Sequence, residues 1–229
     1  MMSRKEEIAQ NLSHVRERIE NSARSVGRKS SEIELIAVTK TFPISDAVLL
    51  CELGFTQFGE NRDSEGAAKS TQVSGHWHFQ GQIQSKKLKS ITAWASFIHS
   101  LDSLEHCEKI AGLCAQRVAD PLGIFIQVSL DGAEGRGGVL PKFLPPLADC
   151  VLKSPGLKLM GLMAVAPLGV EPDSAFEQLA VIHNDFSGRY PQAKALSAGM
   201  SNDYESAIHH GATHIRLGSS ILGSRTPAL

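Results

Sequence analysis

The sequence lacks several features that mark whole classes of protein. Its four cysteines, Cys51, Cys107, Cys114 and Cys150, include no C-x-x-C pair, so neither a disulfide framework nor a zinc site is expected. No apolar run is long enough to cross a bilayer, and the first ten residues, MMSRKEEIAQ, lack the apolar core of a signal peptide. We therefore expect a cytoplasmic protein with no membrane partner.

An excess of charge of either sign is also missing. The 23 basic and 24 acidic residues leave a formal net charge of -1, so nothing favours nucleic acid or another polyanion as a partner. The dense basic cluster SKKLK (85–89) is predicted to be the solvated start of a helix. Apolar residues make up 42% of the chain and charged residues 21%, which is ordinary for a globular protein with a real core.

Short apolar runs alternate with helical segments along the whole chain. Eight runs are predicted to be strands: 33–39, 55–60, 76–81, 96–101, 123–130, 158–165, 193–199 and 213–218. Such alternation favours a parallel sheet with right-handed crossovers. We predict an α/β fold, a single (β/α)₈ TIM-type barrel over residues 1–229. An open doubly wound sheet is the alternative, but KTFPIS (40–45) after the first strand has no glycine-rich fingerprint.

An extra helix is expected before the first strand. Apolar residues recur at helical spacing in the first 27 residues, at Ile8, Leu12, Val15 and Ile19. This helix is expected either to cover the bottom of the barrel or to form a dimer contact. The protein is accordingly expected to be a monomer or a weak homodimer.

Function in such a barrel sits where the strands end, and the last two strand ends are the most informative. Ser201 follows the seventh strand in a serine-rich turn, and Gly218-Ser219 follows the eighth. Glycine allows close backbone approach, and serine hydroxyls add donors, so both turns suit a phosphate group. Helix capping by Ser201 and Ser219 is the structural alternative.

Two basic residues flank these turns. Strand alternation puts Arg216 on the inner face, where a guanidinium must meet a carboxylate or an acceptor on a bound ligand. Lys40 ends the first strand and faces the same mouth, where partial burial and a nearby cation would lower its pKa. A nucleophilic lysine, a phosphate cradle and a buried arginine together predict pyridoxal 5'-phosphate held as a Schiff base.

Six motifs, in order, resemble those of the pyridoxal phosphate homeostasis proteins, a family of alanine racemase N-terminal-like barrels. They are LIAVTK, FGENRDSE, WHFQGQIQSKK, GLMAVAP, LSAGMSNDYESAI and HIRLGSSILGSR, and the likeness covers nearly the whole chain. The resemblance implies a carrier and regulator of the cofactor inside the cell, with no committed catalytic reaction. Cofactor-dependent apoenzymes are its implied recipients.

The resemblance also implies roles for individual residues. Lys40 would carry the cofactor, Arg216 would face the ring nitrogen, and Asn61 would lie beside it. Ser201 and the Gly218-Ser219 turn would bind the phosphate. His78, in the W-H-F stretch, is carried over as a further cofactor-binding residue.

The sequence departs from the family pattern in three places. Lys86 and Lys87 stand in the QSKK stretch, where an asparagine often precedes the second lysine. Arg136 stands before a glycine where the family often has lysine, and Ala198 replaces a common methionine. These departures leave the roles of Arg136, Lys86 and Lys87 open.

An amino-acid racemase of low activity is the main enzymatic alternative. Related racemases add a C-terminal β domain, whereas this sequence ends at Leu229 soon after the eighth strand, so that domain is expected to be absent. They also use a second acid/base, usually a tyrosine, for which only Tyr190 and Tyr204 are candidates. An arginine at the ring nitrogen would leave the ring a weak electron sink.

Two further functional hypotheses are a metal hydrolase and a nucleotide-binding loop. His76 and His78 share a strand face, as ligands of a metal hydrolase would, but no carboxylate or third histidine accompanies them, and no metal is expected. DGAEGRGGV (131–139) follows a strand as a nucleotide loop would, yet it matches neither G-x-G-x-x-G nor the P-loop spacing.

Overall fold

Eight parallel strands close into a barrel in the computed structural model, which describes residues 2–223. Met1 and residues 224–229, the ends of the expected domain, lie outside the described residues. The strands are β1 (Glu34–Val38), β2 (Gln57–Glu60), β3 (His76–Phe79), β4 (Phe97–Leu101), β5 (Leu122–Gln127), β6 (Leu157–Met163), β7 (Ala195–Ser197) and β8 (His214–Leu217).

The barrel closes because the first and last strands pair. Ile36 of β1 lies opposite Arg216 of β8, and each strand pairs in parallel with the next one in the chain. The predicted fold is therefore confirmed, and the open sheet is excluded. All eight predicted strands are present, although each is shorter than predicted, and β7 has only three residues.

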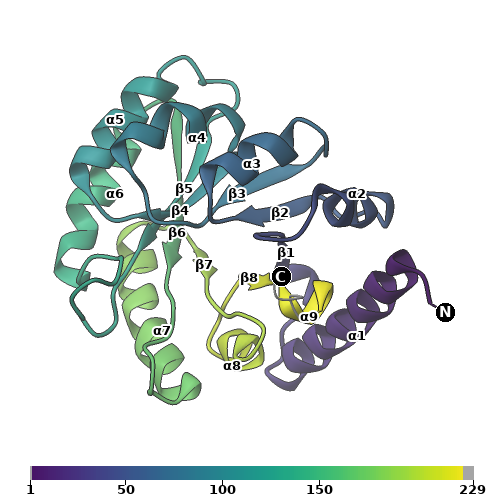
Figure 1. Cartoon of the computed structure of the whole chain (residues 1–229). Coiled ribbons are helices and arrows are strands. Elements are labelled where there is room, and N and C mark those ends of the chain that lie inside the picture. The colour runs from purple at the N-terminus through teal and green to yellow at the C-terminus, as the bar shows by residue number, and fades with distance from the viewer. Residues whose placement is uncertain (1, 224–229) are drawn as a thin grey trace.

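Helices cover the outside of this barrel (Figure 1). They are α1 (Arg4–Ser25), α2 (Ile44–Glu52), α3 (Asp63–Ser70), α4 (Leu88–Trp94), α5 (Leu104–Cys114), α6 (Leu144–Leu152), α7 (Pro172–Arg189), α8 (Tyr204–His209) and α9 (Ser219–Leu222). Short 3₁₀ turns lie at Ser30–Glu32, Ser85–Lys87 and Pro141–Phe143. The four cysteines lie on α2, α5 and α6 and are unpaired. Within residues 2–223, no helix combines the length and apolar character needed to cross a membrane.

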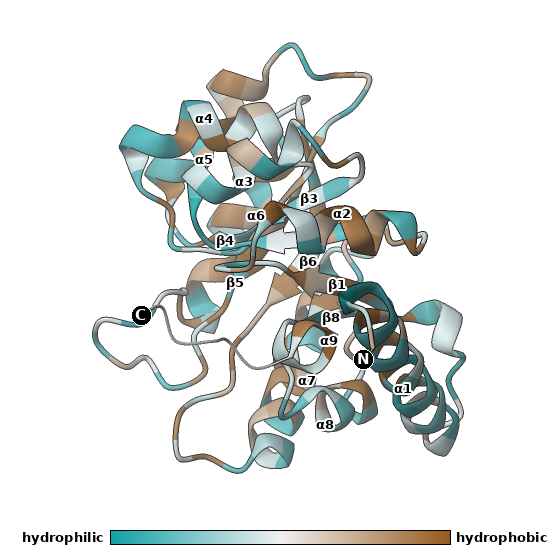
Figure 2. Cartoon of the chain, turned by 45° about the vertical axis from the view of Figure 1, so that its right-hand side comes forward, coloured by the Kyte–Doolittle hydropathy of each residue, from teal (hydrophilic) through white to brown (hydrophobic). Residues whose placement is uncertain are grey.

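The extra N-terminal helix α1 packs against α8 and α9 on the side of the barrel (Figure 1). Its predicted apolar face is buried at Ile8, Leu12, Val15 and Ile19, and the rest of the helix is largely hydrophilic (Figure 2). Ser3 caps its N-terminus in a reciprocal pair with Glu6. The helix thus covers the wall where α9, only four residues long, gives little cover.

Two different interiors result from the alternation of side chains along each strand. Between strands and helices lies a continuous hydrophobic core that includes Ile215 and Leu217 of β8. Arg216, between them, faces inward, as predicted, and is buried. The barrel interior is unusual because histidine, serine and arginine side chains pack there beside Phe125.

Candidate functional site

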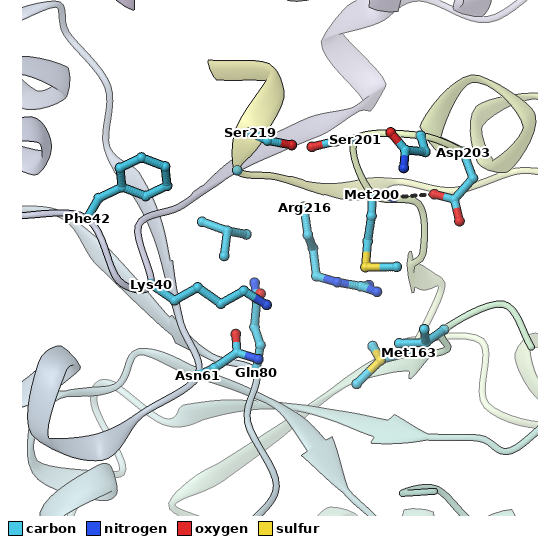
Figure 3. Close-up of a pocket in the computed structure, with 14 residues that line it drawn as sticks. Lys40, Phe42, Asn61, Gln80, Met163, Met200, Ser201, Asp203, Arg216 and Ser219 are labelled. Atoms are coloured by element: carbon cyan, nitrogen blue, oxygen red, sulfur yellow. Dashed lines mark hydrogen bonds between the residues drawn. The ribbon is translucent and has the colours of Figure 1, made fainter. Parts of the chain in front are cut away.

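A cavity of about 390 Å³ opens at the C-terminal ends of the strands. Six of the seven residues predicted from the sequence line it: Lys40, Asn61, Ser201, Arg216, Gly218 and Ser219. In Figure 3 the Lys40 side chain points across the cavity toward Arg216, with Ser201 and Ser219 above and Asn61 and Gln80 below. Segments far apart in the sequence therefore meet in one pocket.

The backbone around Lys40 is held in an unusual conformation. Thr41 has a φ of 68°, the only positive φ outside glycine among the described residues. Its N–H donates to Oε2 of Glu65 on α3 at 2.7 Å. Strain of this kind persists only where surrounding contacts enforce it, and it is common at functional sites.

A buried polar cluster behind the strand wall supplies those contacts. Lys69 of α3 donates from Nζ to the carbonyl oxygen of Thr39 at 2.7 Å and to Oε1 of Glu60 at 2.6 Å. The Thr39 hydroxyl donates to the same Glu60 oxygen at 2.6 Å. Burial raises the pKa of Glu60, and the bonds from Lys69 and Thr39 oppose that rise. We call Thr39, Glu60, Glu65 and Lys69 the outer cluster; it fixes the residues on both sides of Lys40.

The two predicted phosphate turns lie against each other. The Ser220 N–H donates to Oγ of Ser201 at 3.4 Å, which joins the β7 and β8 turns. A Cβ on Gly218 would lie 3.2 Å from the carbonyl oxygen of Val38, so a larger residue would crowd strand β1. Neither serine is an N-cap residue, since these positions are Asp203 for α8 and Gly218 for α9; Ser201 instead accepts from the first turn of α9.

Arg216 contributes a cation to the floor of the cavity. Its Nη1 donates to Oγ of Ser197 at 2.8 Å and its Nη2 to the carbonyl oxygen of Ala164 at 3.0 Å. Burial lowers the pKa of Arg216 to about 10, so the guanidinium remains charged at neutral pH. Within residues 2–223, Arg216 forms no ion pair with a carboxylate. Of the two partners expected for this guanidinium, a carboxylate or a ligand acceptor, the fold therefore does not supply the first.

Gln80 adds an amide that the sequence analysis did not assign to the site. Within the described part of the chain, its buried Nε2 has no hydrogen-bond partner, and the residue lines the cavity. A buried unpaired donor facing a cavity is costly unless a ligand accepts from it. The sequence did contain an indication of this position, because Gln80 lies two residues after His78 on the same face of the extended segment.

The donor set fits pyridoxal 5'-phosphate. A primary amine, a cation, a close-approach glycine with serine hydroxyls, and an unpaired amide donor surround one cavity. These groups match an aldehyde, a ring nitrogen, a phosphate and further acceptor atoms, respectively.

His78 does not line the cavity. It is 1% exposed inside the barrel, with Nε2 2.9 Å from Oε1 of Gln57 and Nδ1 2.8 Å from Nε2 of His99. His99, its partner, lies in the middle of β4 and is 0% exposed. His78 was assigned to the cofactor from the W-H-F motif of the resemblance, and alternation along β3 places it inside the barrel below the cavity.

Neither tyrosine lines the cavity. The Tyr190 hydroxyl lies on the outside of the barrel and donates to Oδ1 of Asp149 at 3.0 Å. Tyr204 is buried beneath the Arg18 guanidinium, which lies 5.5 Å from the centre of its ring. The cavity walls thus hold no tyrosine that would act as a second acid/base.

The structure gives little support to the hypotheses of a metal site and of a nucleotide-binding loop. Residues 2–223 hold no group of three histidine, cysteine or acidic side chains suited to a metal ion. In the 131–139 loop, the N–H groups of Ala133 and Gly138 donate to the chain's own carboxylates, Asp131 and Asp102. Arg136 bonds Asp131 and the carbonyl oxygen of Ala166, which ties this loop to the next.

Comparisons with known proteins identify a family for this chain. The family model "Alanine racemase, N-terminal domain" matches residues 8–226. A pyridoxal phosphate homeostasis protein of Mycobacterium leprae is 39% identical over 96% of this chain and 93% of its own length. PipY of Synechococcus elongatus, solved with PLP bound, superposes with a TM-score of 0.79 at 28% identity, covering 94% of this chain and 100% of PipY. An alanine racemase of Clostridium difficile shares the fold, with a TM-score of 0.71 at 16% identity; the match covers 96% of this chain and 57% of the racemase.

Proposed function

Because the chain belongs to the family of alanine racemase N-terminal domain barrels, in the branch of the pyridoxal phosphate homeostasis proteins, we propose that it binds pyridoxal 5'-phosphate as a Schiff base on Lys40. The observation that carries the proposal is the cavity in which Lys40 and Arg216 face each other beneath the serine turns. The cofactor supplies an aldehyde that condenses with a primary amine.

The polar cavity residues described above have distinct proposed roles in binding the cofactor. Ser201, Gly218 and Ser219 hold the phosphate through hydroxyl and backbone donors. Arg216 donates a hydrogen bond to the ring nitrogen without transferring its proton, because it stays charged well above neutral pH. Asn61 and Gln80 donate from the opposite wall.

The proposed role is a carrier and regulator of the cofactor in the cytoplasm, which makes it available to cofactor-dependent apoenzymes. An arginine opposite the ring nitrogen keeps the ring unprotonated and weakens its capacity to stabilise a carbanion. No tyrosine on the cavity wall supports a second proton transfer. Both points argue against efficient racemisation, the alternative activity.

The test of the binding site is borohydride reduction followed by peptide mapping. The wild-type protein with cofactor should give one stable adduct, on Lys40, and Lys40→Ala should lose both the adduct and the visible imine band. Lys87→Ala serves as the control, because Lys87 lies outside the cavity near Asp63. An adduct on Lys69, Lys86 or Lys87 instead would refute the assignment.

The phosphate turn is tested by comparing pyridoxal with its phosphate ester. The ester should bind at least about tenfold more tightly to the wild type, the equivalent of one good hydrogen bond to a charged group. Gly218→Val should remove most of that difference, because its side chain would fill the approach to the turn. Equal affinity of the wild type for the two forms would count against a phosphate site here.

The carrier role is tested by proton NMR of alanine in heavy water. We expect α-hydrogen exchange far below about 1 s⁻¹, the lower end of ordinary enzyme rates. Faster exchange that disappears in Lys40→Ala would favour the racemase instead.

A further inference from the structure

A continuous row of hydrogen bonds crosses the barrel interior beneath the cavity. It starts at Arg216 Nη1, which donates to Ser197 Oγ at 2.8 Å. Ser197 Oγ lies 2.9 Å from His99 Nδ1, and His99 Nε2 lies 2.8 Å from His78 Nδ1. The row ends where His78 Nε2 meets Oε1 of Gln57 at 2.9 Å. Four strands contribute to it in addition to β8: β7, β4, β3 and β2.

The two imidazoles in this row are held apart from water. His99 and His78 are 0% and 1% exposed, and each stacks on a phenylalanine. The ring centroids of His99 and Phe125 are 4.2 Å apart, and those of His78 and Phe97 are 4.5 Å apart. Burial lowers the pKa of both histidines well below the usual value, so both are neutral at physiological pH.

The direction of the row follows from the chemistry of its first member. An arginine side chain only donates, so Ser197 Oγ must accept from it. The serine hydroxyl then donates to His99 Nδ1, which makes Nε2 the protonated nitrogen of His99. By the same step, His78 accepts at Nδ1 and donates from Nε2 to the Gln57 carbonyl oxygen.

The opposite direction leaves a buried group unpaired. If His99 donated from Nδ1, Ser197 would accept two hydrogen bonds, and its hydroxyl hydrogen would have no acceptor in the row. Ser197 is 0% exposed, so an unpaired hydroxyl there costs about 1–3 kcal/mol. Only the direction that starts at Arg216 satisfies every polar atom of the row.

We propose that Ser197, His99 and His78 are positioning residues for Arg216, joined in a one-directional hydrogen-bond relay that holds its guanidinium against the floor of the cofactor cavity. Both histidines are then Nε2–H tautomers. The neutral relay leaves Arg216 without a hydrogen-bonded carboxylate, so that Asp203, which also lines the cavity, acts on its charge only at longer range, and the relay directs the remaining N–H groups to the cavity. The part of this inference that concerns the cofactor ring rests on the proposed function; the relay itself does not.

The relay is tested first without cofactor. Long-range ¹H–¹⁵N NMR of histidine-labelled protein near pH 7.5 distinguishes the two neutral tautomers, with His78→Gln and His99→Asn used to assign the signals. We expect the Nε2–H pattern for both rings. An Nδ1–H tautomer or a charged imidazolium at either position would overturn the relay.

A pair of variants then separates positioning from general damage to the core. His99→Asn keeps an oxygen near the former Nδ1, so Ser197 retains its acceptor and Arg216 its position. His99→Gln moves the amide toward the former Nε2, and Ser197→Ala removes the link altogether. Exposed His14 provides His14→Gln as the control, which should change nothing.

The readout is affinity for the cofactor relative to its benzene analogue, which has C–H in place of the ring nitrogen. Ser197→Ala and His99→Gln should weaken cofactor binding about tenfold more than binding of the analogue, while His99→Asn should stay near the wild type. Equal losses for both ligands would mean a merely structural role and would overturn the positioning assignment.

Failure of the proposed function has a different signature. A wild-type protein that binds neither ligand would remove the role of Arg216 toward the ring, and that half of the inference would fall. The tautomer measurement would still decide the relay, because it uses the protein alone.

Discussion

Two buried polar groupings lie on opposite faces of the barrel wall. One pairs its buried cation with a carboxylate, whereas the other surrounds its cation with neutral hydrogen-bond acceptors. In the outer cluster, between the barrel and α3, the Lys69 ammonium is paired with the Glu60 carboxylate. In the interior relay, the Arg216 guanidinium meets only a hydroxyl, a carbonyl oxygen and, beyond them, neutral histidines. Both groupings support a residue of the cavity, Lys40 in the first case and Arg216 in the second.

The difference follows from where each cation must act. Lys69 has a structural task, and a carboxylate partner offsets the cost of burying its charge. Arg216 faces the cavity, where a carboxylate partner would cancel the charge available to a ligand. Neutral acceptors fix its geometry while preserving that charge, which explains why histidine and serine occupy the barrel centre.

The largest expected effect comes from breaking the outer cluster. Lys69→Met should lower the free energy of unfolding by about 3–5 kcal/mol, because it leaves the buried Glu60 carboxylate without its partner. Urea unfolding near pH 7 measures this loss. Lys89→Met, on the exposed side of α4, is the matched control and should change stability by less than about 0.5 kcal/mol.

Adding Glu60→Gln to Lys69→Met tests whether the loss of stability comes from the unpaired Glu60 carboxylate. The double variant should regain part of the lost stability, because the unpaired charge is gone. A single-variant loss below about 1 kcal/mol would mean that the pair behaves like a surface pair and that the contrast between the two groupings fails.

Lowering the pH is expected to have an intermediate effect on the free energy of unfolding. Burial depresses the pKa of His78 and His99, and that of His214 falls to about 4. These histidines bind protons more readily when unfolded, with a pKa near about 6.5, so stability is full above that pH and declines as pH falls. Each can contribute a slope of up to about 1.4 kcal/mol per pH unit.

Glu60 acts in the opposite sense. Its pKa is raised in the fold, so its contribution is largest below the pKa of the unfolded chain and falls as pH rises. Burial raises the pKa of Glu34 as well, but the three histidines outweigh these two carboxyl groups, and we expect net destabilisation from pH 7 to 5 in urea unfolding. His99→Asn should reduce the slope, whereas His14→Gln should not; an identical slope in His99→Asn would show that the buried ring does not cause it.

The smallest effect is expected at an exposed ion pair between α1 and α8. Arg18 bonds Glu205 through two contacts of 3.0 and 2.7 Å, yet both side chains are over 40% exposed. Water and salt screen such pairs, so Arg18→Gln should cost about 0.2–1 kcal/mol, and less in high salt. Because Arg18 also covers the Tyr204 ring, Glu205→Gln is the cleaner variant. A loss approaching that of Lys69→Met would erase the distinction between buried and exposed pairs.

The fold was largely predictable because its signals are local. Alternating apolar runs and amphipathic segments, such as the face of Ile8, Leu12 and Val15, appear in any short window of the sequence. Strand boundaries were less accurate, since the ends of β3 and β4 depend on pairing with neighbouring strands. The lengths of these strands cannot be deduced from one segment alone.

The cavity residues were predictable for the same reason, with one exception. Lys40, Ser201 and Gly218 lie at or just after the ends of predicted strands, and a closed parallel barrel brings such strand ends together, while alternation along β8 turns Arg216 inward. His78 was carried over from the W-H-F motif of the resemblance and faces inward below the cavity, because inward positions repeat every second residue along β3.

By itself, then, the sequence determined the barrel, the N-terminal helix and the set of polar strand ends, because periodicity and turn chemistry are properties of neighbouring residues. Only the tertiary structure decided which polar residues meet. Lys69 reaches Glu60 because α3 packs behind β2, and Ser197 reaches His99 because β4 and β7 face each other across the barrel. Such partners lie up to 98 residues apart, and the closure of the sheet, to which all eight strands contribute, brings them within hydrogen-bonding distance.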